Sequence, residues 1–285
     1  MAKLADTVLT DSEISNQLNG ESHVVAFGTN KVRYVTLGAG DATLVFIHGW
    51  ACNLNFWREQ APAFVDKAKL VFIDLPGHGK SDKPNTAYTM DFLARAVVAV
   101  LRDIRAEKVV LVGHSMGAAV MCRVYQQMPE KVAALVSVDG LMCRPPGTPD
   151  LARQFVGQFC VPEWQAHARK FFSTFFPYPG TEKLRDQVVA DMLATPQYVI
   201  ASEAENIASP EQPDWALPGV EVPLLVLNAR SPLWSERYEQ YVKSLSSQVD
   251  YHVYDGVGHF LMLEKPAEFN TNLTEGLQKF GVLPK

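Results

Sequence analysis

A serine flanked by glycines stands where a predicted strand meets a predicted helix. The segment 113–117 reads Gly-His-Ser-Met-Gly; it follows a β-branched run and precedes a helix-forming stretch. Ser115 on such a tight turn would hold its hydroxyl clear of its neighbours, and the glycines let strand and helix approach closely. The first N–H groups of the helix, including that of Met116, point to where negative charge develops. The pattern indicates a G-x-S-x-G nucleophile turn, with an ordinary βα turn as the alternative.

Two other turns carry groups suited to the same chemistry. The segment 48–50 reads His-Gly-Trp and ends a buried-strand pattern, which places backbone N–H groups at the carboxyl edge of the sheet. We expect the N–H of Trp50 to face that of Met116 and complete an oxyanion hole. The segment 256–259 reads Gly-Val-Gly-His and follows the last predicted strand. Its glycines let His259 reach over the sheet edge.

These turns need a scaffold in which short apolar strands alternate with helices. The sequence predicts a hairpin over 24–27 and 32–36, strands at 43–48, 69–73, 109–112, 132–138, 223–228 and 251–254, and helices at 55–65, 90–104, 116–127, 235–245 and 266–280. Thr89 is placed to cap the second of these helices, and Thr195 to cap another that begins at Pro196. The alternation predicts the α/β class, with a doubly wound, mostly parallel sheet.

With these residues the chain resembles the α/β-hydrolase superfamily, in its group of lidded serine esterases, lactonases and C–C hydrolases. The resemblance covers nearly all of residues 22–285 and implies an α/β-hydrolase fold with an inserted helical lid. In that superfamily the chain order is nucleophile, acid, histidine. The resemblance therefore implies Ser115 as nucleophile and His259 as base, with the N–H groups of Trp50 and Met116 as the oxyanion hole.

The acid departs from the usual pattern of the superfamily. The carboxylate usually follows the strand that is here 224–228, but this chain has Ser231 there and no acid before Glu236. The strand beside the nucleophile's own ends in Asp139, which opens on the same crevice. Some members carry their acid there, so we predict Asp139 as the acid, within about 2.6–3.2 Å of the histidine Nδ1. The alternatives are a turn-forming role for this residue and an acid at Asp255, which we expect to be a solvated turn residue.

Other polar residues in the motif turns have a structural interpretation. Asp74 begins the segment Asp-Leu-Pro-Gly-His-Gly and is expected to shape that turn. His48, His78 and His114 also lie in turns, where ring nitrogens commonly satisfy backbone groups. The remaining histidines are scattered, so the sequence predicts no metal site and no cofactor.

The sequence divides into three parts. Residues 1–21 are predicted to be a polar leader, residues 22–141 and 219–285 the core, and residues 142–218 a helical lid that starts at a proline-rich break. The lid is rich in aromatic residues. We expect them to pack on the core and, with less support, to line an apolar substrate pocket with Trp50; the candidates are Phe155, Trp164 and Phe171.

Composition narrows the class of protein. The 285 residues hold 26 Lys and Arg against 31 Asp and Glu, a net charge of −5 without a basic stripe, which argues against nucleic acid as a partner. No run reaches the roughly 18 apolar residues of a membrane span. The four cysteines lack CxxC spacing, which favours reduced thiols in a cytoplasmic protein. A monomer or a homodimer is compatible with all of this.

The sequence therefore favours a serine hydrolase that cleaves a small hydrophobic ester or lactone. No aspartate stands at the nucleophile position, which argues against haloalkane dehalogenase or epoxide hydrolase chemistry. Two alternatives stay open. One is a C–C bond hydrolase of a β-diketone-like ketone, and the other is a hydrolase-like ligand receptor with slow turnover.

Overall fold

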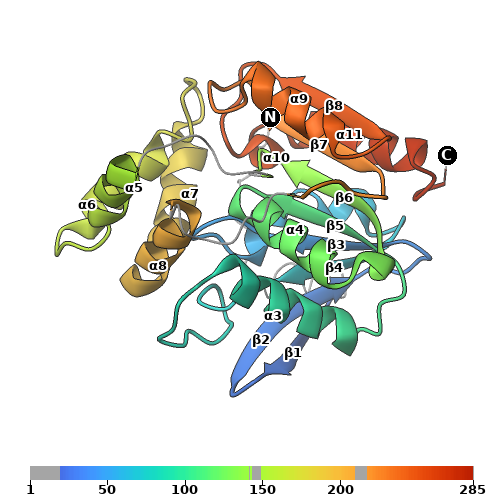
Figure 1. Ribbon diagram of the computed structural model, residues 1–285, viewed down its shortest axis with the longest axis horizontal. Helices are drawn as coiled ribbons and strands as arrows, with labels where there is room; N and C mark the ends of the chain where they lie inside the picture. The colour runs from blue at the N-terminus through green and yellow to red at the C-terminus, as the bar shows by residue number, and fades with distance from the viewer. Residues whose placement is uncertain (1–19, 141, 143–148, 209–216, 285) are drawn as a thin grey trace, which may run out of the picture.

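The structure, a computed structural model, describes residues 20–140, 142, 149–208 and 217–284. These residues form one eight-stranded sheet in the order β1-β2-β4-β3-β5-β6-β7-β8 (Figure 1). β2 pairs antiparallel with β1 and β4, and all other neighbours are parallel, so the predicted fold class is confirmed. The strands are β1 (Glu21–Phe27), β2 (Asn30–Leu37), β3 (Thr43–Ile47), β4 (Lys69–Ile73), β5 (Val109–His114), β6 (Val132–Val138), β7 (Leu224–Ala229) and β8 (Val249–Tyr254).

The parallel register brings the ends of several strands to one edge of the sheet. Ile47, the last residue of β3, pairs with Gly113, and Gly113 pairs with Ser137 of β6. Val138, the last residue of β6, pairs with Leu227 of β7. The turns that follow these strands therefore meet at the carboxyl edge, where open α/β sheets bind their ligands.

The central strands β5 and β7 are buried at every position, because helices cover both faces of the sheet. α3 and α4 pack against each other and pass in front of the strands in Figure 1. Thr89 caps α3 as predicted, since its hydroxyl accepts the N–H of Phe92. The helices are η1 (Leu54–Trp57), α2 (Ala61–Phe64), α3 (Met90–Asp103), α4 (Met116–Gln127), η2 (Pro129–Lys131), α5 (Pro149–Gly157), α6 (Trp164–Ser173), α7 (Glu182–Leu193), α8 (Gln197–Ala208), α9 (Glu236–Ser244), α10 (Leu261–Glu264) and α11 (Pro266–Lys279).

One predicted helix is wrong. Residues 55–65 form the short 3₁₀ helix η1 and the single-turn helix α2 rather than one continuous helix. Pro62 has no N–H for an intrahelical bond and is favoured in the first turn, so it starts a new helix instead of extending the first. Gln60, between the two, donates its side-chain amide to Met262 O at 3.0 Å and so ties this segment to α10.

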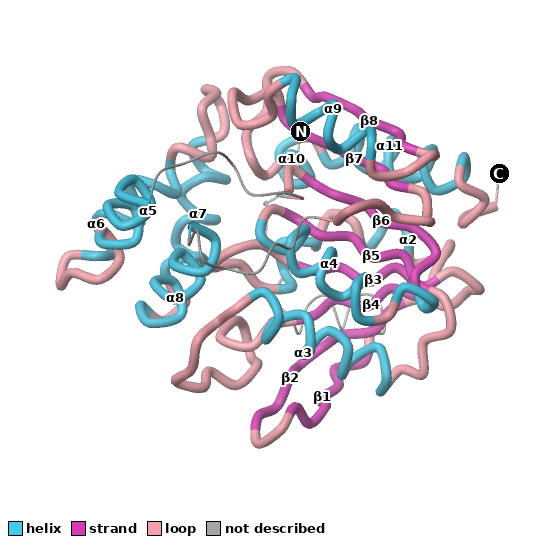
Figure 2. The backbone as a smooth tube through the Cα atoms, in the orientation of Figure 1, coloured by secondary structure: helices cyan, strands magenta, loops and turns pink. Residues whose placement is uncertain are grey.

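Between β6 and β7 the described residues 149–208 contain helices and no strand. α5, α6, α7 and α8 lie together beside the sheet rather than on its faces (Figures 1 and 2). This agrees with the helical character predicted for residues 142–218, of which 143–148 and 209–216 lie outside the described residues. We refer to α5–α8 as the helical insertion.

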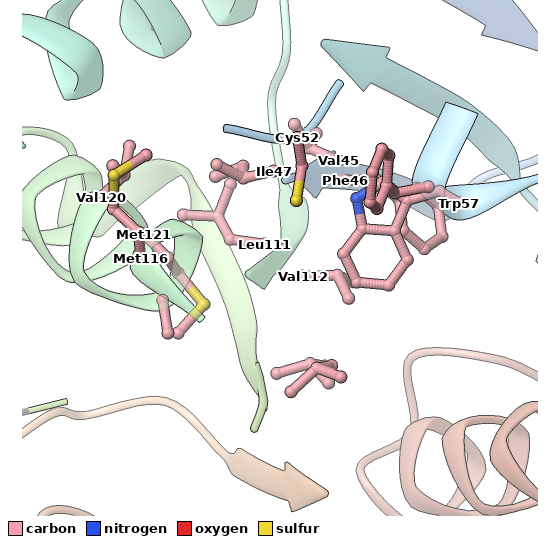
Figure 3. Close-up of a cluster of buried hydrophobic side chains, with 14 of the residues drawn as sticks. Val45, Phe46, Ile47, Cys52, Trp57, Leu111, Val112, Met116, Val120 and Met121 are labelled. Atoms are coloured by element: carbon pink, nitrogen blue, oxygen red, sulfur yellow. The ribbon is translucent and has the colours of Figure 1, made fainter. Parts of the chain in front are cut away.

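The strands and the helix that flank the nucleophile turn contribute side chains to the apolar core. Figure 3 shows a cluster of them from β3, β5 and α4, and they are almost fully buried: Val45, Phe46, Ile47, Leu111, Val112, Met116, Val120 and Met121. The elements that carry the candidate site therefore rest on close-packed side chains, which fixes their relative positions.

The predicted leader of residues 1–21 lies outside the described residues except at its end, where Glu21 already begins β1. Among the described helices, none combines the length and the apolar character that a membrane crossing requires.

Candidate active site

Ser115 occupies a strained turn between β5 and α4. Its backbone has φ +55° and ψ −120°, a region that residues with a side chain rarely adopt. The N–H of Ser115 donates to Val138 O at 3.0 Å, and Met116 is the first residue of α4. The side chain is half-buried. A strained, partly exposed serine at the head of a helix is the geometry that the sequence predicted for a nucleophile turn.

Two glycines are needed for this turn. A Cβ on Gly117 would lie 2.4 Å from Ile47 O, and one on Gly113 would lie 2.4 Å from Gly117 O. Any side chain would push α4 away from the ends of β3 and β5. The glycine spacing read from the sequence thus reflects the close contact between strand and helix.

The two turns that carry the predicted oxyanion donors meet at Ser115. Gly49 is so close that a Cβ placed on it would be 3.0 Å from Ser115 Cβ, and Trp50 follows directly. The N–H of Met116 has no intrahelical acceptor, because it belongs to the first turn of α4. The arrangement suits a negatively charged oxygen, and the catalytic use of these groups stays a prediction.

Asp139 contacts His259 as the sequence predicted. Its Oδ2 lies 2.6 Å from His259 Nδ1, and its side chain is 4% exposed. Asp139 follows β6, and its own N–H donates to Leu227 O at 2.8 Å. The backbone has φ +41°, so this residue too is held in an uncommon conformation. The loops that follow β6 and β8 therefore bring together residues that are 120 positions apart.

The second oxygen of Asp139 is held by the segment that lacks the usual acid. Oδ1 accepts the Ala229 N–H at 2.8 Å and the Trp234 Nε1–H at 2.7 Å. Nothing in the sequence pattern pointed to Trp234, which lies beyond the end of β7. These two N–H donors fix the plane of the Asp139 carboxyl group.

The alternative acids lie elsewhere. Asp255 is exposed and pairs with Arg230, whose side-chain hydrogen bond holds the pKa of the Asp255 carboxyl below its usual value. Glu236 is an exposed residue in the first turn of α9. The interpretation of Asp255 as a solvated turn residue agrees with its exposure.

The loop of His259 is fixed by three backbone contacts. The ring of His114 donates from Nε2 to His259 O at 2.9 Å. The N–H of His259 donates to Phe175 O in the helical insertion, also at 2.9 Å. The N–H of Gly258 donates to Glu264 Oε2 at 2.9 Å. The imidazole next to Asp139 is thereby held from the core and from the insertion.

The polar residues with a predicted structural role fulfil it. Asp74 is fully buried and accepts the N–H groups of Leu54 and Lys80, each at 3.0 Å. His48 donates from Nδ1 to Gly49 O and accepts the Leu75 N–H on Nε2. Burial lowers the pKa of His48 well below its usual value, so the ring is neutral.

Burial has the same effect on the pKa of His114, which is also lowered well below its usual value, so that ring too is neutral. Its hydrogen bond to His259 O needs the proton on Nε2. His114 therefore supports the His259 loop without carrying charge.

Aromatic rings of the insertion surround Trp50. Its ring lies 5.1–5.9 Å from the four rings of Phe155, Phe159, Phe171 and Phe172. Phe171 also contacts Phe175 at 5.2 Å, and the ring of Phe175 lies 4.6 Å from His259. An apolar wall therefore runs from the predicted oxyanion turn to the histidine.

Two of the three insertion residues predicted to line the pocket are part of this apolar wall, namely Phe155 and Phe171. Trp164 is buried in α6 and is not among the rings that contact Trp50 in the described chain. In the same ranges no three His, Cys, Asp or Glu side chains gather in a way that could hold a metal ion.

A parallel sheet with a serine turn, a histidine loop and a carboxylate at its carboxyl edge defines the hydrolase class of α/β proteins. The pattern of the family described as "alpha/beta hydrolase fold" matches residues 42–266 of the sequence. The chain belongs to the α/β-hydrolase family.

Individual relatives agree with this assignment. The 2-hydroxy-6-oxononadienedioate/2-hydroxy-6-oxononatrienedioate hydrolase of Paraburkholderia phymatum is 28% identical; the match covers 96% of this chain and 99% of that protein. A dihydrolipoyllysine-residue acetyltransferase component of the acetoin cleaving system of Pseudomonas putida is 38% identical over 38% of this chain. That match spans only 30% of the relative's length. The solved structure of an esterase from Exiguobacterium antarcticum has a TM-score of 0.82 at 18% identity, covering 90% of this chain and all of that one, and so shares the fold.

Proposed function

We propose that this protein is a serine hydrolase that cleaves a hydrophobic carboxylic ester or lactone through an acyl-enzyme. Ser115 is the nucleophile, His259 the base and Asp139 the acid. The observation that carries the proposal is the 2.6 Å contact between Asp139 Oδ2 and His259 Nδ1, at the sheet edge that also holds the strained Ser115. A buried carboxylate, an imidazole and a partly exposed serine are the groups that acyl transfer needs.

In the first half of the reaction, His259 Nε2 takes the proton of the Ser115 hydroxyl as its oxygen attacks the substrate carbonyl. The N–H groups of Trp50 and Met116 stabilise the oxyanion. Asp139 keeps the proton on His259 Nδ1 and stabilises the imidazolium. The tetrahedral intermediate collapses, the C–O bond of the ester breaks, and the histidine returns its proton to the leaving alcohol.

In the second half, His259 takes a proton from water, which attacks the acyl-enzyme. The second tetrahedral intermediate expels Ser115, whose oxygen recovers the proton, and the carboxylic acid leaves. Each half uses the same oxyanion donors, and the sum is the addition of one water to one ester bond. The chain's own residues supply every group in this sequence of steps.

The apolar wall supports an apolar substrate. Trp50, Phe171 and Phe175 connect the two ends of the site, and Phe155 and Phe171 are only partly buried. Large, partly exposed rings beside a reactive serine favour an acyl or alcohol group without charge. The helical insertion then acts as the lid of the site. A reduced, cytoplasmic setting belongs to the same proposal, supported by the burial of the Cys52 and Cys122 side chains.

A C–C bond hydrolase is the second candidate. It is favoured by the full-length match to a relative whose named substrate, a 2-hydroxy-6-oxo dienedioate, holds a ketone and two carboxylates but no ester. Incubation with a paired ester and β-diketone, followed by product analysis, separates the two functions. Preferential cleavage of the diketone would replace the ester proposal.

The proposal is tested with Ser115→Ala and a series of p-nitrophenyl esters from acetate to decanoate. We expect a loss of roughly 10⁴-fold or more in kcat, because the variant lacks the nucleophile. A fluorophosphonate probe should label one peptide, the one that contains Ser115. Ser231→Ala is the matched control. Ser231 stands where the family's usual acid would be and takes no part in the proposed mechanism, so this variant should keep full turnover.

Two results would contradict the proposal. Full activity in Ser115→Ala, or labelling of a different peptide, would remove Ser115 from the chemistry. Turnover of the wild type far below about 1 s⁻¹ on every ester, together with tight binding of a ligand, would favour a receptor.

A further inference from the structure

His48 is a buried residue that the mechanism above does not use. It directly precedes the predicted oxyanion turn, and its side chain is 0% exposed. Both ring nitrogens have partners: Nδ1 lies 2.9 Å from Gly49 O, and Nε2 lies 3.1 Å from the backbone nitrogen of Leu75. One ring thus joins the turn after β3 to the turn after β4, which begins at Asp74 and has no part in the proposed chemistry.

These two partners permit a single state of the ring. The backbone nitrogen of Leu75 is a donor, so Nε2 of His48 must accept and carries no hydrogen. The one proton of a neutral imidazole is then on Nδ1, which donates to Gly49 O. A second proton would set two N–H groups against each other at Nε2. Burial lowers the pKa of His48 well below its usual value, which agrees with a ring that stays neutral.

The carbonyl that His48 contacts belongs to the peptide that carries a predicted oxyanion donor. The Gly49 C=O and the Trp50 N–H are parts of one planar unit, and no peptide bond among the described residues is cis. In a trans peptide the C=O and the N–H point in opposite directions. Any contact that fixes the direction of the Gly49 carbonyl therefore fixes the direction of the Trp50 N–H.

The Gly49 carbonyl has two donors of different kinds. The N–H of Cys52 donates to it at 3.2 Å from within the same turn, so this donor moves when the turn moves. His48 donates at the shorter distance of 2.9 Å, from a ring whose other nitrogen is bonded to a separate part of the core. His48 is thus the contact that ties the orientation of this peptide to a position outside the turn.

The residues that follow in this turn are held by the helical insertion. Trp50 Nε1 donates to Ile200 O at 3.1 Å, and the hydroxyl of Thr195 donates to Ala51 O at 3.2 Å. These bonds fix a side chain and a later carbonyl. Neither of them reaches the peptide between Gly49 and Trp50.

The turn that orients His48 is itself firmly placed. Asp74 is fully buried, and its carboxyl group accepts the Leu54 N–H at 3.0 Å and the guanidinium of Arg33 at 3.1 Å. Leu75 is also fully buried. The Leu75 N–H is therefore a fixed donor, and the imidazole of His48 is oriented by it.

The orientation of this peptide matters because it lies against the nucleophile turn. A Cβ on Gly49 would be 3.0 Å from Ser115 Cβ and 2.9 Å from His114 Nδ1. An oxyanion donor acts at about 2.7–3.1 Å from the charged oxygen, so a small rotation of the peptide weakens its contribution.

We propose that His48 is a positioning residue of the oxyanion hole, which links the turn beginning at Asp74 to the Gly49–Trp50 peptide and so directs the Trp50 N–H. It acts through the backbone and does not touch the substrate. The inference rests on the proposed function, since it assigns a role in stabilising the oxyanion. Two buried turns with a structural role in the fold then also serve the chemistry.

The test compares two amides that each keep one of the two contacts of the imidazole. In His48→Asn the amide nitrogen takes the position of Nδ1 and can still donate to Gly49 O, but the acceptor for the Leu75 N–H is lost. In His48→Gln the amide oxygen reaches the position of Nε2 and can still accept from Leu75, but the donor to Gly49 is lost.

A misdirected oxyanion donor weakens the transition state and leaves ground-state binding intact. We expect kcat of His48→Gln on p-nitrophenyl butyrate, per site titrated with a fluorophosphonate, to fall about 10- to 100-fold. His48→Asn should lose less than about threefold, and KM should stay within about twofold of the wild type in both variants. Affinity for a trifluoromethyl ketone, which forms the same oxyanion, should fall with kcat.

His78→Gln is the matched control. His78 is also fully buried, and its ring lies 4.9 Å from that of His48. Its Nδ1 makes the same kind of local contact, to Pro76 O at 3.0 Å, but that carbonyl belongs to no predicted donor peptide. The control should lower the Tm and keep kcat per titrated site within about twofold of the wild type.

Three results would overturn the inference. Equal kcat per titrated site in His48→Gln and the wild type, or equal losses in the Asn and Gln variants, would show that His48 only supports the fold. A higher KM at unchanged kcat would assign its effect to substrate binding. Should neither variant fold, ¹⁵N NMR of the wild type decides: a neutral His48 with its proton on Nδ1 from about pH 5 to 8 supports the inference, and a proton on Nε2 refutes it.

Failure of the proposed function has a different signature. In that case the wild type shows no ester turnover and no fluorophosphonate adduct on Ser115, whatever the state of His48. Failure of the present inference leaves an active wild type whose kcat His48→Gln matches.

Discussion

Replacing Asp139 by Asn tests the acid with the smallest change in shape. Oδ1 of Asp139 accepts two N–H groups, from Ala229 and Trp234, and Oδ2 faces His259 Nδ1. In Asp139→Asn the amide oxygen must take the place of Oδ1, because the amide nitrogen cannot accept those two hydrogens. The amide NH₂ group is then directed at the imidazole.

An NH₂ group beside Nδ1 forces the wrong tautomer of His259. Nδ1 has to accept, so the ring proton moves to Nε2, which can no longer take the proton of Ser115. The variant loses the productive tautomer of His259 and the carboxylate that stabilises the imidazolium, and together these losses lower the rate by up to about 10⁴-fold. At 1.36 kcal/mol for each factor of ten, this corresponds to about 5.4 kcal/mol of transition-state stabilisation.

The fold should tolerate Asn at this position. Asn has nearly the same volume as Asp and is one of the few residues that accept a positive φ such as the +41° found here. Both N–H donors keep an acceptor. We therefore expect kcat/KM on p-nitrophenyl butyrate to fall about 10⁴-fold while the Tm stays within a few degrees of the wild type.

Asp139→Ala is the comparison that separates the effect of the wrong His259 tautomer from the loss of the carboxylate. It removes the carboxylate but leaves the imidazole free to place its proton on either nitrogen, so Asp139→Asn should be at least as inactive. Long-range ¹H–¹⁵N NMR of the histidine rings reports the tautomer directly. The reasoning is refuted if the Asn variant keeps more than about a tenth of the activity, or if its His259 still carries the proton on Nδ1.

Two further predictions concern the residues around this contact. Trp234→Phe removes one of the two donors to Asp139 Oδ1, and since a hydrogen bond to a charged group contributes about 1.5–3 kcal/mol, kcat/KM should fall roughly tenfold or more. Trp164→Phe is the control, because this buried Trp donates no hydrogen bond to Asp139 among the described residues, and it should change the Tm more than the rate. Equal rates in both variants would show that Trp234 does not position the acid. Phe171→Ala opens the aromatic wall between Trp50 and Phe175, so activity on long-chain esters should fall more than activity on the acetate. A uniform loss across the series, measured as kcat/KM for each chain length, would mean that Phe171 only supports the insertion.

Local patterns in the sequence predicted the framework of this site. The run 109–117 specifies a buried strand, two glycines and a helix start within nine consecutive residues, so its structure follows from steric rules that act between neighbours. The parallel sheet adds one further rule, that the ends of adjacent strands share an edge. That rule, the absence of an acid near Ser231 and the resemblance to members that carry their acid after the earlier strand together predicted the contact between Asp139 and His259.

The sequence was less informative about where a helix ends and about which of its faces contacts the rest of the protein. The helix predicted over 55–65 divides between Trp57 and Ala61, where the Gln60 side chain donates to Met262 O and Pro62 favours the start of a new helix. Trp164 and Phe171 were both predicted to line the pocket because both are aromatic residues of the insertion; of the two, Phe171 contacts the ring of Trp50, and the role of Trp164 stays a prediction. The face that a helix turns to its neighbours depends on how helices pack, which composition does not contain.

Only the tertiary structure decided which groups support the site. Trp234 is 95 residues from Asp139, and the Ile200 carbonyl is 150 residues from the Trp50 ring that it binds. Neither residue lies in a motif, and each acts through a single hydrogen bond whose partner is set by the packing of whole elements. The motifs formed by residues close in sequence could therefore be predicted from the sequence. The contacts that orient the side chains of the site join residues far apart in sequence and form only when the chain has folded.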